Sequence, residues 1–173
     1  MTGLTTLGII HTAISLVAVG AAIGALARYR EIRASQLAGR IYIWSTVLTC
    51  VTGFGVFQHG GFAKPHALGV LTLAVLGIAA LAGRGSVFGR ASRYMETIAY
   101  STTVFFHTIP GLTETFTRLP VGAPAFGGPD DPALQKVVGV FFVLLVVGCF
   151  MQVRHLRGHG AIAEPAQAAQ RTR

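Results

Sequence analysis

The sequence is poor in charged side chains. Only 12% of its 173 residues are Asp, Glu, Lys or Arg, whereas a soluble globular domain has ~25%. Hydrophobic residues make up 52% of the chain, which excludes an ordinary soluble domain and also a disordered chain. Aromatic residues contribute only 9%, so most of the apolar surface is aliphatic, as is typical of helices that contact lipid.

Cysteine is equally scarce. The two cysteines, Cys50 and Cys149, lie inside separate apolar runs, which excludes a disulfide framework and a Cys-x-x-Cys metal site. The chain also lacks a Gly-x-Ser-x-Gly nucleophile turn, a His-Glu-x-x-His pattern and a glycine-rich phosphate loop. A hydrolase or a nucleotide-dependent enzyme is therefore not indicated.

Long apolar runs are what the chain has in quantity. A helix crosses a hydrocarbon core of ~30 Å with ~20 residues. Five runs approach or exceed this length, and they cover residues 4–27, 40–58, 66–83, 94–112 and 136–154. We therefore predict an all-α integral membrane bundle of five transmembrane helices over residues 1–157, followed by a flexible cytoplasmic tail at 158–173. The fourth run is the least apolar, because it contains Glu96, His107 and Pro110.

The basic residues predict the orientation of these spans. Lys and Arg accumulate on the cytoplasmic side of short loops. With five spans, eleven of the fourteen basic residues fall on one side, and only Lys64, Arg118 and Lys136 fall on the other. This distribution predicts an outside N-terminus and a cytoplasmic C-terminus. It also explains the net charge of +8 through topology and anionic headgroups, with no nucleic-acid binding.

The first apolar run is interpreted as a retained span. A cleaved signal peptide begins with a basic segment and has an apolar core of about 7–15 residues. Here the run is longer, and no basic residue precedes Arg28.

Histidines gather toward the predicted outer face. His11 lies ~10 Å deep in the first run at 1.5 Å per residue, and His107 has a similar depth in the fourth run. His59 lies in a short outer loop, and His66 opens the third run. We predict that His11 and His107 share one cofactor, with His66 as an alternative ligand. The cofactor would be haem b between two axial histidines, or copper or zinc if His59 and Glu114 also contribute.

A hydrogen-bonding role is the alternative for these histidines. Imidazoles inside a membrane need polar partners, and a Ser or Thr of a neighbouring helix supplies one for His11. In that case His59 and His66 would be interfacial residues.

A polar stripe follows the fourth run. Glu96, Tyr100, Thr103 and His107 are spaced by 4, 3 and 4 residues, so they share one face of a helix. Because a polar face is costly in lipid, we expect it to point inward. The expected neighbours in the second run are Ser45, Thr46, Thr49 and Thr52.

Two roles are open for Glu96 at the inner end of this stripe. The first is a structural ion pair with Arg90 or Arg93, which lie within reach at the cytoplasmic boundary. The second is a proton relay, in which the stripe passes protons between the cytoplasmic face and His107.

The connection 113–135 differs from the other loops in length and composition. It contains four prolines and a Gly-Gly step, which restrict its conformation without making it helical. Long external loops of this kind often serve as lids or docking surfaces. We predict that another membrane protein docks here.

Short motifs resemble those of an uncharacterised family of bacterial multi-pass membrane proteins. They are Gly39-Arg40-Ile41-Tyr42, Gly60-Gly61, and His66 followed by Leu71-Thr72-Leu73. The resemblance implies a bacterial inner-membrane setting and a four-helix core with the fifth, C-terminal span as an addition. It implies no established activity.

Three functions follow from these features. The first is a haem- or metal-binding membrane component in redox chemistry or assembly, with His11 and His107 as ligands. The second is a non-catalytic accessory subunit that docks through the external loop. The third is a small proton-coupled transporter that uses Glu96 and His107.

Overall fold

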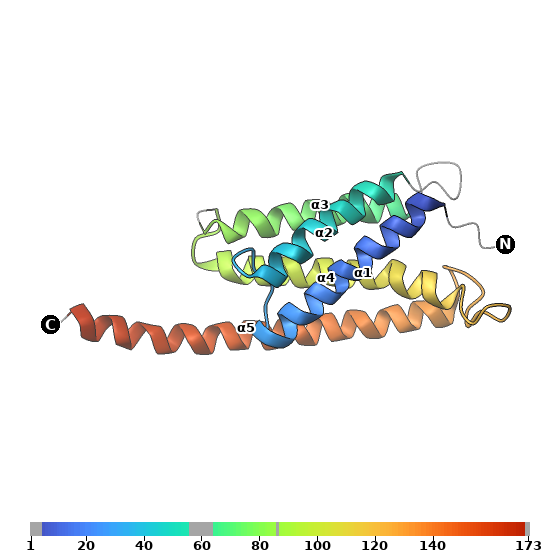
Figure 1. Ribbon diagram of the computed structural model, residues 1–173. Helices are drawn as coiled ribbons and strands as arrows, with labels where there is room; N and C mark the ends of the chain where they lie inside the picture. Colours follow the sequence, from blue (N-terminus) through green and yellow to red (C-terminus); the bar gives the residue numbers. More distant parts are fainter. Residues whose placement is uncertain (1–4, 56–63, 86, 172–173) are drawn as a thin grey trace.

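The chain folds into five α-helices, described here from a computed structural model for residues 5–55, 64–85 and 87–171, with side chains as far as Gly158. The helices are α1 (Thr6–Tyr29), α2 (Leu37–Phe54), α3 (Lys64–Gly83), α4 (Ser92–Phe116) and α5 (Pro132–Arg171), with a short 3₁₀ helix, η1 (Gly89–Ala91), before α4 (Figure 1). The described residues form no β-strand. The all-α prediction is confirmed.

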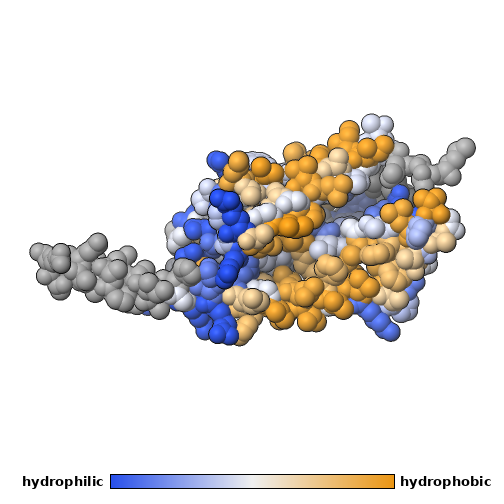
Figure 2. Space-filling view, turned by 60° about the horizontal axis from the view of Figure 1, so that its bottom comes forward, coloured by the Kyte–Doolittle hydropathy of each residue, from blue (hydrophilic) through white to orange (hydrophobic). Residues whose placement is uncertain are grey.

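Four of these helices are long and apolar enough to cross a membrane: α1, α2, α3 and the Pro132–Gly158 part of α5. Their exposed side chains are largely apolar, with Leu16, Ile23 and Trp44 each more than 60% exposed. Figure 2 shows these hydrophobic side chains in a broad band, with hydrophilic side chains concentrated at the end from which α5 projects. The apolar surface indicates a lipid environment.

Helix α4 has a different character. It has 25 residues, a length of about 37 Å, and it lies alongside α3 and α5 (Figure 1). Its inward face carries buried polar side chains, among them Glu96, Tyr100 and Thr103. These polar side chains explain why α4 is not among the four apolar helices although it packs against α3 and α5.

The turn between α1 and α2 sets the position of α2. Arg30 follows the last residue of α1 and caps the helix. It has a left-handed φ of 60°, and its N–H donates to the Leu26 carbonyl at 2.9 Å. A Cβ at Gly39 would lie 2.0 Å from the backbone oxygen of Arg33, so only glycine allows this approach. The close contact holds the turn near the beginning of α4. There Glu31 forms an ion pair with one α4 side chain, and Arg33 forms an ion pair with another.

The connection between α4 and α5 is shorter than predicted, because α4 continues to Phe116 and α5 begins at Pro132. The rings of Phe116 and Phe126 meet edge-to-face with centroids 5.6 Å apart. Asp131 caps α5, and the N–H groups of Gly127 and Ala133 donate to its carboxylate at 3.0 and 2.8 Å. These bonds lower the pKa of Asp131.

The C-terminal helix also departs from the predicted boundaries. The expected span ends at 154 and the expected tail begins at 158, whereas the backbone of α5 is helical as far as Arg171.

Candidate functional site

A hydrogen bond between buried side chains joins α2 to α4. Tyr42 and Thr103 are both fully buried, and the Tyr42 hydroxyl lies 2.7 Å from Thr103 Oγ1. Thr103 donates its own proton to the Tyr100 carbonyl at 2.8 Å. Because a threonine hydroxyl has one proton, Tyr42 is the donor to Thr103 in this arrangement.

His107 extends this contact along the same interface. Its Nε2 lies 3.1 Å from Thr46 Oγ1, and Thr46 is fully buried one helical turn after Tyr42. The His107 and Tyr42 rings meet edge-on, with centroids 6.1 Å apart and an interplanar angle of 66°. We call Tyr42, Thr46, Thr103 and His107 the α2–α4 network.

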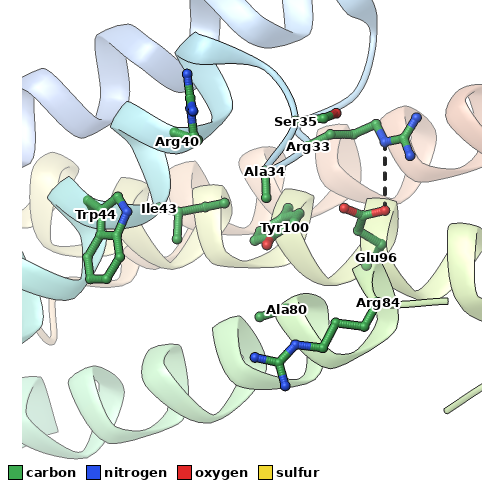
Figure 3. A pocket seen from close by; sticks show the side chains of 11 residues that line it. Arg33, Ala34, Ser35, Arg40, Ile43, Trp44, Ala80, Arg84, Glu96 and Tyr100 are labelled. Carbon is green, nitrogen blue, oxygen red and sulfur yellow. Dashed lines mark ion pairs between the residues drawn. The ribbon is translucent and has the colours of Figure 1, made fainter. Parts of the chain in front are cut away.

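A cavity of about 400 Å³ adjoins this network. Glu96 and Tyr100 of α4 line it, and Tyr100 also accepts the Thr103 bond (Figure 3). Three arginines, Arg33, Arg40 and Arg84, line the same cavity. The polar stripe therefore leads from an arginine-lined cavity to His107.

Glu96 is buried at the inner end of the stripe, with a side chain only 7% exposed. Its Oε2 lies 3.8 Å from Nε of Arg33 (Figure 3), and a Cβ at Gly83 would lie 2.9 Å from its Oε1. The absence of a side chain at Gly83 thus leaves room for the carboxylate beside α3.

The predicted partners of Glu96 were wrong, although the ion pair itself exists. Arg93 pairs with Glu31, at 3.3 Å from Nη2 to Oε1, and Arg33 takes the place beside Glu96. The turn between α1 and α2 brings both Glu31 and Arg33 to α4, and this long-range contact has no sign in the sequence of α4 itself.

Later residues of α2 carry a second group of polar side chains, which contacts α1. His11 Nδ1 lies 3.1 Å from Thr52 Oγ1, and Thr52 donates to the Leu48 carbonyl at 2.8 Å. Ser15 donates to the His11 carbonyl at 2.8 Å and lies 3.5 Å from the Thr49 hydroxyl. We call His11, Ser15, Thr49 and Thr52 the α1–α2 cluster.

This cluster confirms the alternative prediction that His11 bonds to a hydroxyl of a neighbouring helix. A Cβ at Gly53 would lie 3.1 Å from Cε1 of His11, so the glycine makes space for the imidazole. Of the α2 residues expected opposite the α4 stripe, Thr46 does contact α4. Thr49 and Thr52 contact α1 instead, three and six residues further along α2 than Thr46, which is about 4.5 and 9 Å along the helix.

The predicted cofactor ligands are distributed over several places. His11 and His107 bond to α2 residues that are six positions apart, which corresponds to about 9 Å along the helix. His66 is buried in the first turn of α3, and Glu114 pairs with Arg118 at 2.6 Å. His59 lies outside the described residues.

These positions give no support to a copper or zinc site. Within the described segments, no group of three or more His, Cys, Asp or Glu side chains has a metal-binding arrangement. In the α1–α2 cluster and the α2–α4 network, each imidazole bonds to its own threonine. A haem shared by His11 and His107 stays a prediction.

Gln152 is a polar contact that sequence reasoning missed. Its Oε1 accepts from the Ser101 hydroxyl at 2.9 Å, and its Nε2 donates to the Arg30 carbonyl at 2.9 Å. One side chain thereby joins α5, α4 and the end of α1. A single amide inside an otherwise apolar run was the available signal, since such a group avoids lipid.

The residues that carry the family resemblance have separate structural roles. Gly39 permits the close approach to Arg33, Arg40 lines the cavity, and Tyr42 bonds to Thr103. The resemblance itself stays a prediction. Comparisons of the chain with family models, with curated proteins and with solved structures find no match.

Proposed function

We propose that this is a five-span bacterial inner-membrane protein that moves protons along α4, between the cavity at Glu96 and His107. The observation that carries the proposal is the α2–α4 network, which continues the polar path beyond the cavity. Each hydroxyl in the network can both donate and accept a hydrogen bond, and a neutral imidazole can do the same. Buried polar groups of this kind in a membrane most often mark functional paths.

The arrangement of the helices supports α4 as the fifth span. Its beginning lies near the end of α3 and its end near the beginning of α5, so it runs opposite to both (Figure 1). Its polar face points inward, which lowers its average hydropathy without exposing Glu96 to lipid. A five-span path also keeps eleven basic residues on one side.

Topology reporters test this part of the proposal. A reporter fused after Arg173 should remain cytoplasmic, and one inserted at Gly127 should be exported, because the connection between α4 and α5 would be outside. A cytoplasmic signal at Gly127 would overturn the five-span topology.

In the proposed path Glu96 is the proton-binding group nearest the cytoplasm. A proton on its carboxyl group would cross the cavity through water to the region of Tyr100. For the relay, Thr103 would turn its proton from the Tyr100 carbonyl to the Tyr42 oxygen as it accepts another, Tyr42 would pass its own proton to Thr46, and Thr46 would pass one to His107. Arg33, 3.8 Å away, would supply a counter-charge to the Glu96 carboxylate after each transfer.

Proton flux into liposomes tests the function. Purified protein is reconstituted with a pH-sensitive dye inside, and a potassium gradient with valinomycin supplies the potential. Wild-type protein should give flux above empty liposomes, and Glu96→Gln should lower it by about 100-fold, because Gln cannot exchange a proton. Glu114→Gln is the matched control on the same helix, since Glu114 is more exposed and pairs only with Arg118 among the contacts described. Absence of flux, or equal losses in both variants, would contradict the proposal.

Docking through the outer connection is a second candidate function. Leu119 and Val121 are 50% and 82% exposed on a loop held by the Phe116–Phe126 contact. If a partner membrane protein covers them, Val121→Asp should release it from a complex isolated in mild detergent. A chain that migrates alone before and after the substitution would contradict this role.

A further inference from the structure

The mouth of the cavity at Glu96 carries an excess of positive charge. Three arginines line the cavity against one carboxylate. Arg33 lies beside Glu96, whereas neither Arg40 nor Arg84 is within ion-pair distance of an acidic side chain in the described part of the chain. Two cationic side chains thus stand at one opening without a counter-charge from these residues.

These two arginines lie on different helices. Arg40 projects from the first turn of α2, and Arg84 follows directly after α3 (Figure 3). Ile43 and Ala80 lie between them on the facing helices, so the opening is a gap between α2 and α3. Figure 3 shows the two side chains pointing away from each other, and both are long enough to turn toward an anion bound between them.

An apolar stripe on α2 begins beside this opening. Its members are exposed and are spaced by 4, 3, 4 and 3 residues, so they share one lipid-facing side of the helix. They are Leu37 (66% exposed), Ile41 (41%), Trp44 (67%), Leu48 (50%) and Val51 (57%). The stripe leads from the basic end toward the middle of the helix, as an acyl chain does beneath its headgroup.

We infer that the mouth between α2 and α3 binds the phosphate of an anionic glycerophospholipid, with Arg40 and Arg84 as its cationic partners. Guanidinium groups bind phosphate through paired N–H donors, and basic pockets between transmembrane helices on the cytoplasmic side recognise anionic headgroups. With Trp44 at the level of the headgroup, where tryptophan is enriched, the acyl chains would lie on the part of the stripe that follows it, at Leu48 and Val51. This lipid site does not depend on proton transfer and goes beyond the proposed function.

Trp44 offers a direct readout, because it is the only tryptophan in the chain and it lines the cavity. The protein is reconstituted in phosphatidylcholine bilayers that contain a small fraction of brominated-chain phosphatidylglycerol, or the same fraction of brominated-chain phosphatidylcholine. Bromine quenches tryptophan emission only at short range. In wild type the anionic lipid should quench about fivefold more effectively than the zwitterionic one.

Charge variants test the role of the two arginines. Arg40→Gln with Arg84→Gln should make the two lipids quench equally, and Arg40→Lys with Arg84→Lys should retain most of the preference. Arg90→Gln with Arg157→Gln is the matched control, because it removes the same charge from exposed positions at the same end of the molecule. Far-UV circular dichroism verifies that each variant is folded, and a folded Lys pair keeps the test decisive if the Gln pair fails to fold.

Three results would overturn the inference. Equal quenching by both lipids in wild type would exclude a selective site. A preference that survives in the Arg40→Gln, Arg84→Gln protein, or that is lost in the control pair, would remove these arginines from the site. Loss of the preference on adding inorganic phosphate at constant ionic strength would assign the site to a soluble anion.

Discussion

The two sides of α2 use the same residue types, but they connect them differently. Toward α1, Thr52 and Ser15 donate to helix carbonyls, so their protons serve the backbone of α2 and α1. Toward α4, Tyr42 donates across the interface to Thr103, and His107 meets Thr46 beside it. Each side has one histidine on one threonine and hydroxyls that donate to helix carbonyls, but only the second side has a tyrosine hydroxyl that bonds across the interface.

The surroundings of the two histidines differ as well. The α2–α4 network contains three fully buried side chains and adjoins the cavity through Tyr100. His11 is partly exposed beside Gly53, and none of the residues of the α1–α2 cluster lines that cavity. The two histidines have the same kind of partner, and they differ in the burial of that partner and in its distance from the cavity.

Gly39→Ala should have the largest effect, because it disturbs both sides of α2 together. The new Cβ would lie 2.0 Å from the Arg33 carbonyl oxygen, so α2 must shift and the free energy of unfolding should fall by about 3 kcal/mol. Unfolding in mixed detergent micelles measures this. Gly20→Ala is the control, since nothing lies within 4 Å of its Cβ, and it should be neutral or slightly stabilising. Equal stability of both variants would contradict this account of the turn.

Removing one hydroxyl from each side sharpens the comparison. Thr46→Val leaves Nε2 of His107 without its buried partner and should lower the free energy of unfolding by about 2 kcal/mol. Thr52→Val removes the partner of a more exposed imidazole and should cost about 0.5 kcal/mol. The same micelle unfolding compares them, and a larger loss in Thr52→Val would reverse the assignment of the two sides.

The absorption spectrum tests whether the two sides form one cofactor site. If the proton path is the main function, each imidazole keeps its threonine partner, and protein purified from cells supplied with haem should show no Soret band. His11→Ala and His107→Ala should then leave the spectrum unchanged. A Soret band in wild type that both variants remove would show that the histidines share a haem and would displace the proton path as the main function.

The sequence alone predicted the helices better than their contacts. Apolar runs placed α1, α2, α3 and the apolar part of α5 within a few residues, since hydrophobic length determines a span regardless of its neighbours. The inward face of α4 followed from periodicity, and burial of Glu96, Tyr100 and Thr103 confirms it. Periodicity gives a direction within one helix, however, and does not identify the helix that it faces.

The contacts that could not be predicted depend on how the turns fold in space. Arg33 reaches Glu96 because Gly39 allows the backbone of the turn between α1 and α2 to lie close to α2. The sequence alone does not show which residues such a turn brings together. Thr49 and Thr52 were assigned to α4 and face α1, because the rotation of α2 about its axis is determined by packing. Gln152 was passed over inside an apolar run, yet it joins three helices.

Proton flux in a matched pair of variants tests the central claim most directly. Tyr42→Phe removes only the hydroxyl that joins Thr103, and it should lower flux in liposomes by about 100-fold while the fold is retained. Tyr29→Phe, which removes the hydroxyl of an exposed tyrosine at the end of α1, and Thr52→Val should both retain wild-type flux. Wild-type flux in Tyr42→Phe, or an equal loss in Thr52→Val, would show that the α2–α4 network is not the path.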